Sequence, residues 1–327
     1  TLRVTNFNNL ATLSIPCVRA TSIPGLTAEL TPNCDERGKM PYNLDVLIHI
    51  NSCGFRGSEN ECSLLKSGVI PTTNSPYIYV VGDSYTSASN VQEWNSFIKV
   101  AESKLREKIG GAIVFNVGMA AADVNQKVMA IRYFLDKYPT KPTTVVYQWL
   151  LNDYDPVLEF SKSHGIKTKI KMFLRENFFT YRFIVYIKYR LVSSASHSPI
   201  TNADVMKYRK NEFGTEAAFT KLKDKICPFS AYLQSKNILP IFLNPPMQEM
   251  ISDWNDYDQA AQDIDKRINL IAESCGWEVV WPFDELKKYP INDITVDPRG
   301  DHHPNVLGNK IIGEVLGNKL QTVFQKN

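Results

Sequence analysis

Five short apolar runs, each rich in β-branched or aromatic residues, constrain the fold of this chain more than any other feature. They are YIYVVG (77–82), AIVFN (112–116), TTVVYQW (143–149), ILPIFL (238–243) and WEVVW (277–281). Helix-like stretches follow them at 93–109, 125–138, about 205–236, 257–274 and 304–320. Continuous apolar strands that alternate with amphipathic helices indicate a parallel sheet covered on both faces. The sequence therefore predicts an α/β fold, a three-layer α/β/α sandwich with a five-stranded parallel sheet. In such a fold the active site lies beyond the carboxyl ends of the strands.

The first 72 residues break this rhythm. They are rich in Asn, Pro, Thr and Gly and contain one strand-like run, VLIHI (46–50). A chain of 327 residues suits one large domain with an extension. We expect residues 1–72 to form an N-terminal extension that packs on a main domain of residues 73–327.

Charge and hydropathy exclude two classes of protein. The chain has 37 basic and 34 acidic residues, a net charge of +3. This balance is unlike that of a nucleic-acid-binding protein, which carries a basic face or a much higher pI. No run of 18 uncharged apolar residues is present, so no membrane-spanning helix is expected. The chain begins at Thr1, which is compatible with removal of an upstream signal or anchor.

The cysteines bear on the compartment. There are six, with no CxxC pair, which argues against zinc and against a thioredoxin-type redox site. Four of them, Cys17, Cys34, Cys53 and Cys62, lie in the first 62 residues. They are either disulfide-bonded, as suits an extracytoplasmic protein, or buried as small apolar side chains. We favour disulfides, and with them a periplasmic, secreted or membrane-anchored location.

An insertion at about 160–192 separates the third and fourth strands. It combines many aromatic residues with a basic set: Lys162, Lys167, Lys169, Lys171, Arg175, Arg182, Lys188 and Arg190. One interpretation is a cap that contacts a membrane surface or an anionic glycan. The other, which we favour, is an amphipathic helix with its aromatic residues packed inward and its charges solvated.

Polar residues follow three of the predicted strands and precede the last helix. They are Gly82-Asp83-Ser84, Asn116 to Ala121, Leu151-Asn152-Asp153 and Asp301 to Pro304. Each segment taken alone reads as a turn or a helix start. Together they supply what a serine nucleophile needs, namely a base and a third group that orients the base. Ser84 would attack, His303 would take the proton, and Asp301 would fix the histidine tautomer. The Ser84 N–H, a backbone N–H of the second segment and the Asn152 amide would hold the oxyanion.

These segments resemble the blocks of the SGNH hydrolases, also called the GDSL esterase/lipase superfamily. GDSYT matches the first block, NVGMAA the second, LLND the third and DHHPN the fifth. The resemblance covers about 73–327 and implies a flavodoxin-like sheet. It also implies that Ser84 is the nucleophile, Asn152 an oxyanion donor, His303 the base and Asp301 its partner. INSCGFRG (50–57) is similar to a stretch that precedes the catalytic domain in some bacterial members.

The match departs from the family pattern at a few positions. The oxyanion glycine of block two falls at Ala121, and Gly118 is the alternative donor. A backbone N–H survives the change to alanine. Leu150 stands where block three carries glycine, and His302 beside His303 leaves two candidates for the base. The α/β-hydrolase elbow G-x-S-x-G fits worse, because it requires glycine where Thr86 stands.

The expected function is that of a serine-dependent acyl-ester hydrolase or acyltransferase acting on O-acetyl groups of a carbohydrate. A lipid esterase or lysophospholipase, a thioesterase and a catalytically inactive glycan-binding module are the alternatives. Fold does not choose among them. No metal or cofactor is implied, since the calcium-loop-like DWNDYDQ (253–259) has Tyr257 at a ligand position.

Overall fold

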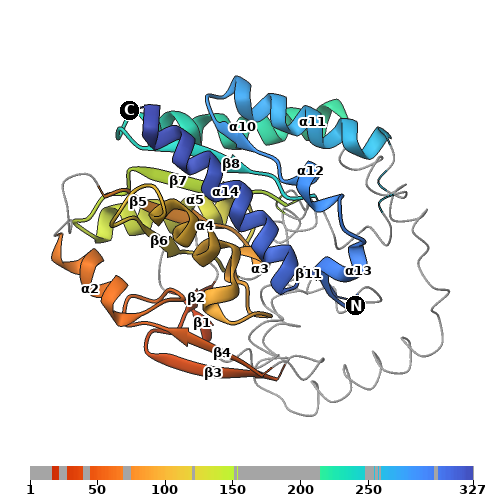
Figure 1. Ribbon diagram of the computed structural model, residues 1–327. Coiled ribbons are helices and arrows are strands. Elements are labelled where there is room, and N and C mark those ends of the chain that lie inside the picture. The colour runs from red at the N-terminus through yellow and green to blue at the C-terminus, as the bar shows by residue number, and fades with distance from the viewer. Residues whose placement is uncertain are drawn as a thin grey trace, which may run out of the picture.

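A five-stranded parallel sheet forms the centre of the protein (Figure 1). The computed structural model describes residues 17–21, 28–39, 45–68, 75–119, 122–150, 153, 214–246, 254, 257, 259–297 and 301–326. The sheet strands are β5 (Tyr77–Val81), β6 (Ile113–Asn116), β7 (Thr144–Gln148), β8 (Leu239–Leu243) and β9 (Glu278–Val280). Their order is β6-β5-β7-β8-β9, the doubly wound order of flavodoxin-like folds. The predicted α/β fold with five parallel strands is confirmed.

The strands read as continuous apolar runs because both faces of the sheet are covered. Successive side chains of a strand point to opposite faces. In β5, Tyr77 and Tyr79 contribute to one hydrophobic cluster, whereas Ile78 and Val80 contribute to the other. All four are fully buried, so no position in this strand faces water.

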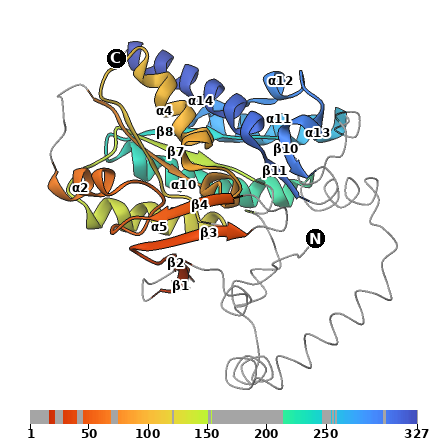
Figure 2. The ribbon, with the colours of Figure 1, turned by 60° about the horizontal axis from the view of Figure 1, so that its bottom comes forward.

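Helices form the two outer layers (Figure 2). The helices are α3 (Ser84–Ser87), η1 (Glu93–Asn95), α4 (Phe97–Arg106), α5 (Val124–Lys137), α10 (Glu216–Gln234), α11 (Gln259–Ser274), α12 (Phe283–Leu286), α13 (Ile291–Ile294) and α14 (Val306–Lys326). α4 and α14 cover one face, and α5, α10 and α11 cover the other. The predicted helices are found at these places; α14 extends six residues beyond the expected end, and residues 205–213 lie outside the described part.

Two glycines let α14 approach α4 closely. A Cβ at Gly313 would lie 2.6 Å from the Phe97 carbonyl oxygen, and one at Gly317 would lie 2.6 Å from Lys104 Cβ. Both distances are too short for carbon in contact, so these positions require glycine for this packing. The close helix pair fixes the start of α14, where the last polar segment of the sequence lies.

The N-terminal part contains more regular structure than the sequence predicted. Besides β4 (Asp45–Ile50), which was expected, it has β1 (Val18–Ala20), β2 (Ala28–Leu30), β3 (Cys34–Lys39) and the helix α2 (Glu59–Ser67). β3 was missed because CDERGK has no apolar run; it pairs antiparallel with β4 and stays largely exposed. α2 begins with a capping box, in which Ser58 and Glu61 exchange side-chain to backbone hydrogen bonds.

Three disulfides are present, which confirms the prediction that the cysteines are disulfide-bonded. Cys17 pairs with Cys34, Cys53 with Cys62 and Cys227 with Cys275. Such bonds persist in oxidising compartments, which favours an extracytoplasmic environment. Among the described residues, no helix is both long and apolar enough to cross a membrane.

Candidate active site

Ser84 is the first residue of α3, directly after the carboxyl end of β5. Asp83 caps this helix, because its Oδ1 accepts the Tyr85 N–H at 3.0 Å. The first N–H groups of a helix have no acceptor within the helix, so the Ser84 N–H points out of the helix start. A Cβ at Gly82 would lie 1.9 Å from Thr86 Oγ1 and 2.3 Å from Gln148 Oε1. The strand can therefore turn into the helix this tightly only with glycine at position 82.

The side chain of His303 contacts Ser84. His303 Nε2 lies 2.8 Å from Ser84 Oγ, although the two residues are 219 positions apart. Both residues are partly exposed, so a substrate can reach the pair. The ring of Tyr85 packs against the imidazole, with 5.2 Å between ring centroids. The hydroxyl and the ring nitrogen are thus within hydrogen-bond distance at the carboxyl edge of the sheet.

His303 lies on β11 (Asp301–Pro304), which pairs antiparallel with β10 (Thr295–Asp297) just before α14. The side-chain amides of Asn90 and Asn309 both donate to the Pro304 carbonyl oxygen, at 2.6 and 2.7 Å. Asn90 comes from the turn after α3, so this contact joins the segment that carries the histidine to the segment that carries the serine.

Two side chains of the sheet hold α3 by three hydrogen bonds. Gln148 Oε1 accepts the Asp83 N–H at 3.2 Å and the Thr86 hydroxyl at 2.9 Å. The Asn116 amide donates to the Thr86 carbonyl oxygen at 2.9 Å. Asn116 and Gln148 are the last residues of β6 and β7, the two strands beside β5. These two strands therefore determine where residues 83–88 lie, which we call the serine turn.

A buried ion pair lies next to these residues. Lys127 Nζ is 2.5 Å from Asp153 Oδ1 and donates to the Gln148 carbonyl oxygen at 2.8 Å, while the Tyr147 hydroxyl donates to Asp153 Oδ2 at 2.9 Å. Burial raises the pKa of Asp153 to about 7; Lys127 opposes this rise and Asp83 adds to it. Lys127 was not among the residues predicted from the sequence. Its place three residues after Val124 and four before Ile131, both buried, puts it on the apolar face of α5, and this pattern could have revealed it.

Two of the candidate oxyanion donors and the side chain of Asp301, the candidate partner of the histidine, lie outside the described residues. The Gly118 N–H donates to Asn116 Oδ1 at 3.0 Å, so in this conformation it is already used. Ala121, Asn152 and the insertion at 160–192 lie outside the described residues. The backbones of Asp301 and His302 belong to β11, but their side chains are also outside the described part. Within that part, no cluster of His, Cys, Asp and Glu side chains could hold a metal, and the Tyr257 hydroxyl of DWNDYDQ bonds to Asp265.

No family model and no curated protein match this chain. Among solved structures, it is similar to the acetyl xylan esterase AlAXEase, with 13% identity, 75% of this chain and 99% of the other covered, and a TM-score of 0.45. It is also similar to the psychrotrophic esterase EstA from Pseudoalteromonas sp., at 12% identity, 77% and 100% coverage and a TM-score of 0.44. A third is a member of the lipolytic protein G-D-S-L family from Veillonella parvula, at 12% identity, 75% and 98% coverage and a TM-score of 0.42. At these values the likeness concerns the fold and says nothing of activity.

Proposed function

We propose that the protein is a serine-dependent acyl-ester hydrolase or acyltransferase of the SGNH type. The observation that carries the proposal is the 2.8 Å approach of His303 Nε2 to Ser84 Oγ at the carboxyl edge of the sheet. A serine hydroxyl becomes a nucleophile when a base within hydrogen-bond reach can take its proton. The same two residues occupy the first and last sequence blocks that resemble this superfamily.

The reaction follows from this pair. Ser84 Oγ attacks the ester carbonyl carbon and its proton passes to His303 Nε2. The tetrahedral intermediate then breaks its bond to the alcohol oxygen, and His303 returns the proton to that oxygen. Water, or the hydroxyl of a second molecule, then attacks the acyl carbon and gives its proton to His303 Nε2. The bond between the acyl carbon and Ser84 Oγ breaks, His303 returns the proton to Ser84 Oγ, and the acid or the new ester leaves. Asp301 is proposed to orient the imidazole and stabilise its charged form.

The oxyanion of the intermediate needs hydrogen-bond donors. We assign the Ser84 N–H, the N–H of Ala121 and the side-chain amide of Asn152 to this role. The Ser84 N–H is suited to it as the first N–H of α3. The engagement of the Gly118 N–H by Asn116 favours Ala121 over Gly118.

The proposed substrate is an O-acetyl group of a carbohydrate. The three disulfides support this choice, because they favour an oxidising compartment, where surface polysaccharides are found. The basic and aromatic composition of residues 160–192 agrees with a glycan ligand. A lipid ester is the competing substrate.

Activity on p-nitrophenyl acetate and labelling by a fluorophosphonate probe test the mechanism. Ser84→Ala and His303→Ala should each abolish nearly all turnover, and the double variant should be little worse, because the pair acts as a unit. His302→Ala is the matched control and should retain activity. Full activity in Ser84→Ala, or no labelling of the wild-type protein, contradicts the proposal.

A panel of substrates tests the proposed specificity for O-acetyl groups of a carbohydrate. Acetate release should be measured over acetylated glycans, with long-chain acyl esters as the lipid comparison and a free glycan added as acceptor. Preference for acetylated glycan supports the proposal, and transfer to the acceptor would identify an acyltransferase. Faster hydrolysis of long acyl chains would favour the lipid esterase.

A further inference from the structure

Arg56 is a buried cation that reaches the serine turn from the N-terminal part of the chain. It lies in the loop between β4 and α2, within INSCGFRG, and is 2% exposed. Nη1 donates to the carbonyl oxygens of Ser87 and Ala88 at 2.8 and 2.5 Å, and Nη2 donates to the Val91 carbonyl at 2.7 Å. A single side chain thus collects three carbonyl groups just after the helix that begins with Ser84.

The serine turn depends on such contacts. α3 has four residues, and one helical turn is not stable by itself in water. Its C-cap, Ala88, adopts the left-handed conformation (φ 48°, ψ 36°), which is unfavourable for a residue other than glycine. Carbonyls at a helix end have no partner within the helix, and Ala88 and Val91 are buried away from water. The Ala88 carbonyl also accepts the Val91 N–H at 3.1 Å. Arg56 is a second donor to it and also donates to the Ser87 and Val91 carbonyls, and so holds the end of the turn.

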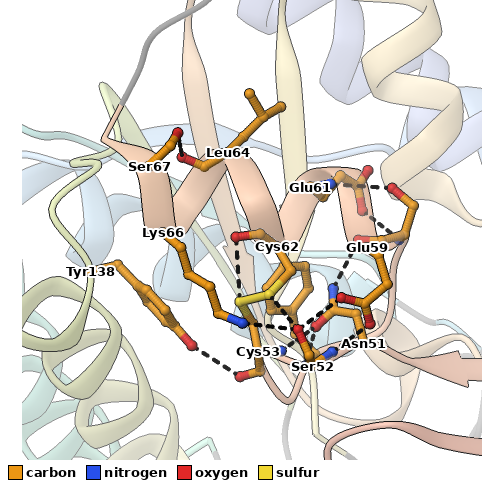
Figure 3. The surroundings of a disulfide bond; sticks show 12 residues. Asn51, Ser52, Cys53, Glu59, Glu61, Cys62, Leu64, Lys66, Ser67 and Tyr138 are labelled. Atoms are coloured by element: carbon orange, nitrogen blue, oxygen red, sulfur yellow. Dashed lines mark hydrogen bonds between the residues drawn. A yellow bond between two sulfur atoms is a disulfide. The ribbon is translucent and has the colours of Figure 1, made fainter.

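The loop that carries Arg56 is itself fixed. Asn51, which is fully buried, accepts the N–H groups of Cys53 and Phe55 with its Oδ1, at 3.0 and 3.4 Å. The Cys53–Cys62 disulfide ties the loop to α2 (Figure 3). Backbone bridges also join Arg56 to Ile50 and to Asn116, the residue that ends β6. The guanidinium therefore projects from a rigid base.

The positive charge of Arg56 is buried among neutral backbone carbonyls. In the described part of the chain Arg56 forms no ion pair with a carboxylate, and its partners are neutral carbonyls. Burial lowers its pKa to about 10, with Glu93 opposing this, so the group is charged at neutral pH. Replacing Arg56 by an apolar side chain would leave the Ser87 and Val91 carbonyls without this donor, which costs free energy for each group. Arg56 therefore stabilises the fold, and a role in placing Ser84 has to be tested by measurements that a loss of stability alone does not change.

We propose that Arg56 is a positioning residue that holds the turn of Ser84 within hydrogen-bond distance of His303. This inference rests on the proposed function, but it concerns a residue that does not touch the substrate. Arg56 acts through the carbonyls of Ser87 and Ala88, and a shift of the turn by about 1 Å would cost about 10²-fold in rate.

The test compares Arg56→Met with Lys99→Met. Lys99 of α4 is a matched control, because it is also a largely buried cation and joins the same two parts of the chain through its bond to Glu61 of α2. It also bonds to Glu102 within α4. Among the described residues, none of its hydrogen bonds and ion pairs reaches α3. The measurements are kcat and KM on p-nitrophenyl acetate, the rate of fluorophosphonate labelling, the melting temperature, and amide hydrogen exchange of residues 84–91.

We expect Arg56→Met to lower kcat and the labelling rate by about 10²-fold with little change in KM, and to speed exchange in residues 84–91. Lys99→Met should lower the melting temperature and leave kcat within about threefold of wild type. Arg56→Lys keeps the charge but cannot bond all three carbonyls, so it should fold and lose roughly tenfold in kcat. If Arg56→Met does not fold, the kcat of Arg56→Lys tests the inference in its place.

Wild-type kcat in folded Arg56→Met or Arg56→Lys would overturn the inference, and so would an equal loss of kcat in Lys99→Met. If the wild-type protein neither labels nor hydrolyses esters, the proposed function fails. The exchange data still test Arg56 in that case: faster exchange at 84–91 confined to the Arg56 variants supports positioning, and unchanged exchange refutes it.

Discussion

Ser84 and His303 lie 2.8 Å apart, yet the turn that carries the serine and the hairpin that carries the histidine are held by different kinds of contact. The histidine region depends mainly on its neighbours in sequence: β10 pairs with β11, and the Asn305 side chain bonds to the carbonyls of Asp293 and Thr295. α14 then continues directly into the packed layer against α4. The long-range contacts of the histidine region include the Asn90 amide on the Pro304 carbonyl and the Tyr85 ring on the imidazole.

The serine region depends on side chains from distant segments. Arg56 lies 31 positions from Ser87, Asn116 lies 30 from Thr86, and Gln148 lies 62 from Thr86. A short turn built in this way has little stability of its own. We therefore expect single substitutions to disturb the serine side more than the histidine side, and the predictions below test that difference.

The largest effect is expected from Lys127→Met, on the serine side. This change leaves Asp153 buried without a counter-charge, which typically costs about 3–5 kcal/mol. Urea unfolding at pH 8, where Asp153 is ionised, measures the loss. The double variant Lys127→Met/Asp153→Leu removes both charges and should recover much of it. A loss below about 1 kcal/mol in the single variant would contradict this account.

The same pair predicts how stability depends on pH. Burial raises the pKa of Asp153 from 3.8 to about 7, so the folded chain holds this proton more tightly than the unfolded chain. The contribution of Asp153 to the free energy of unfolding is therefore greatest below pH 4 and falls as pH rises to about 7. Unfolding measured from pH 4 to 8 should show this slope in the wild-type protein. The double variant should lose that component, and an unchanged profile would refute the assignment.

The disulfides offer a contrast between stability and activity. Cys227–Cys275 closes 48 residues, and its removal by serine substitution should cost about 4 kcal/mol. Cys53–Cys62 closes nine residues and should cost roughly 2–3 kcal/mol. Only removal of Cys53–Cys62 should lower the kcat of the folded protein, because this disulfide fixes the loop that carries Arg56. Unfolding curves and kcat for the two double-serine variants decide, and a loss of kcat confined to the Cys227–Cys275 variant would reverse the interpretation.

The sequence predicted the fold well where local pattern determines structure. The three strands β5, β6 and β7 were predicted because they are buried on both faces, which makes each run apolar along its length. The edge strand β9 was predicted from the apolar residues around Glu278, which is exposed. Ser84 and His303 were chosen as candidates because polar residues at strand ends stood out against those runs, and their side chains do meet. Each of these signals is contained in a few consecutive residues.

What the sequence did not predict depends on partners far along the chain. In the sequence Arg56 is an arginine in a loop, and no residue near it indicates that it bonds to the carbonyls of Ser87 and Ala88. Lys127 stands on the apolar face of α5, but its counter-charge is known only once Asp153 is placed beside it. The half-exposed strand β3 has no apolar period, and its form depends on pairing with β4.

The smallest effect is expected on the histidine side, from Asn305→Ala. Asn305 caps α14, since its Oδ1 accepts the N–H groups of Leu307 and Gly308 at 2.9 and 3.1 Å. Loss of such a cap costs about 1 kcal/mol. The change also removes the amide bonds to the carbonyls of Asp293 and Thr295, each worth about 1 kcal/mol, so the small effect is expected on kcat rather than on stability. The pairing of β10 with β11 and the amides of Asn90 and Asn309 on Pro304 remain, so His303 should keep its place. Unfolding and kcat on p-nitrophenyl acetate measure the two effects, and we expect kcat to stay within about threefold of wild type. A fall in kcat as large as that of Arg56→Met would show that the two regions are equally sensitive and that the contrast between them is wrong.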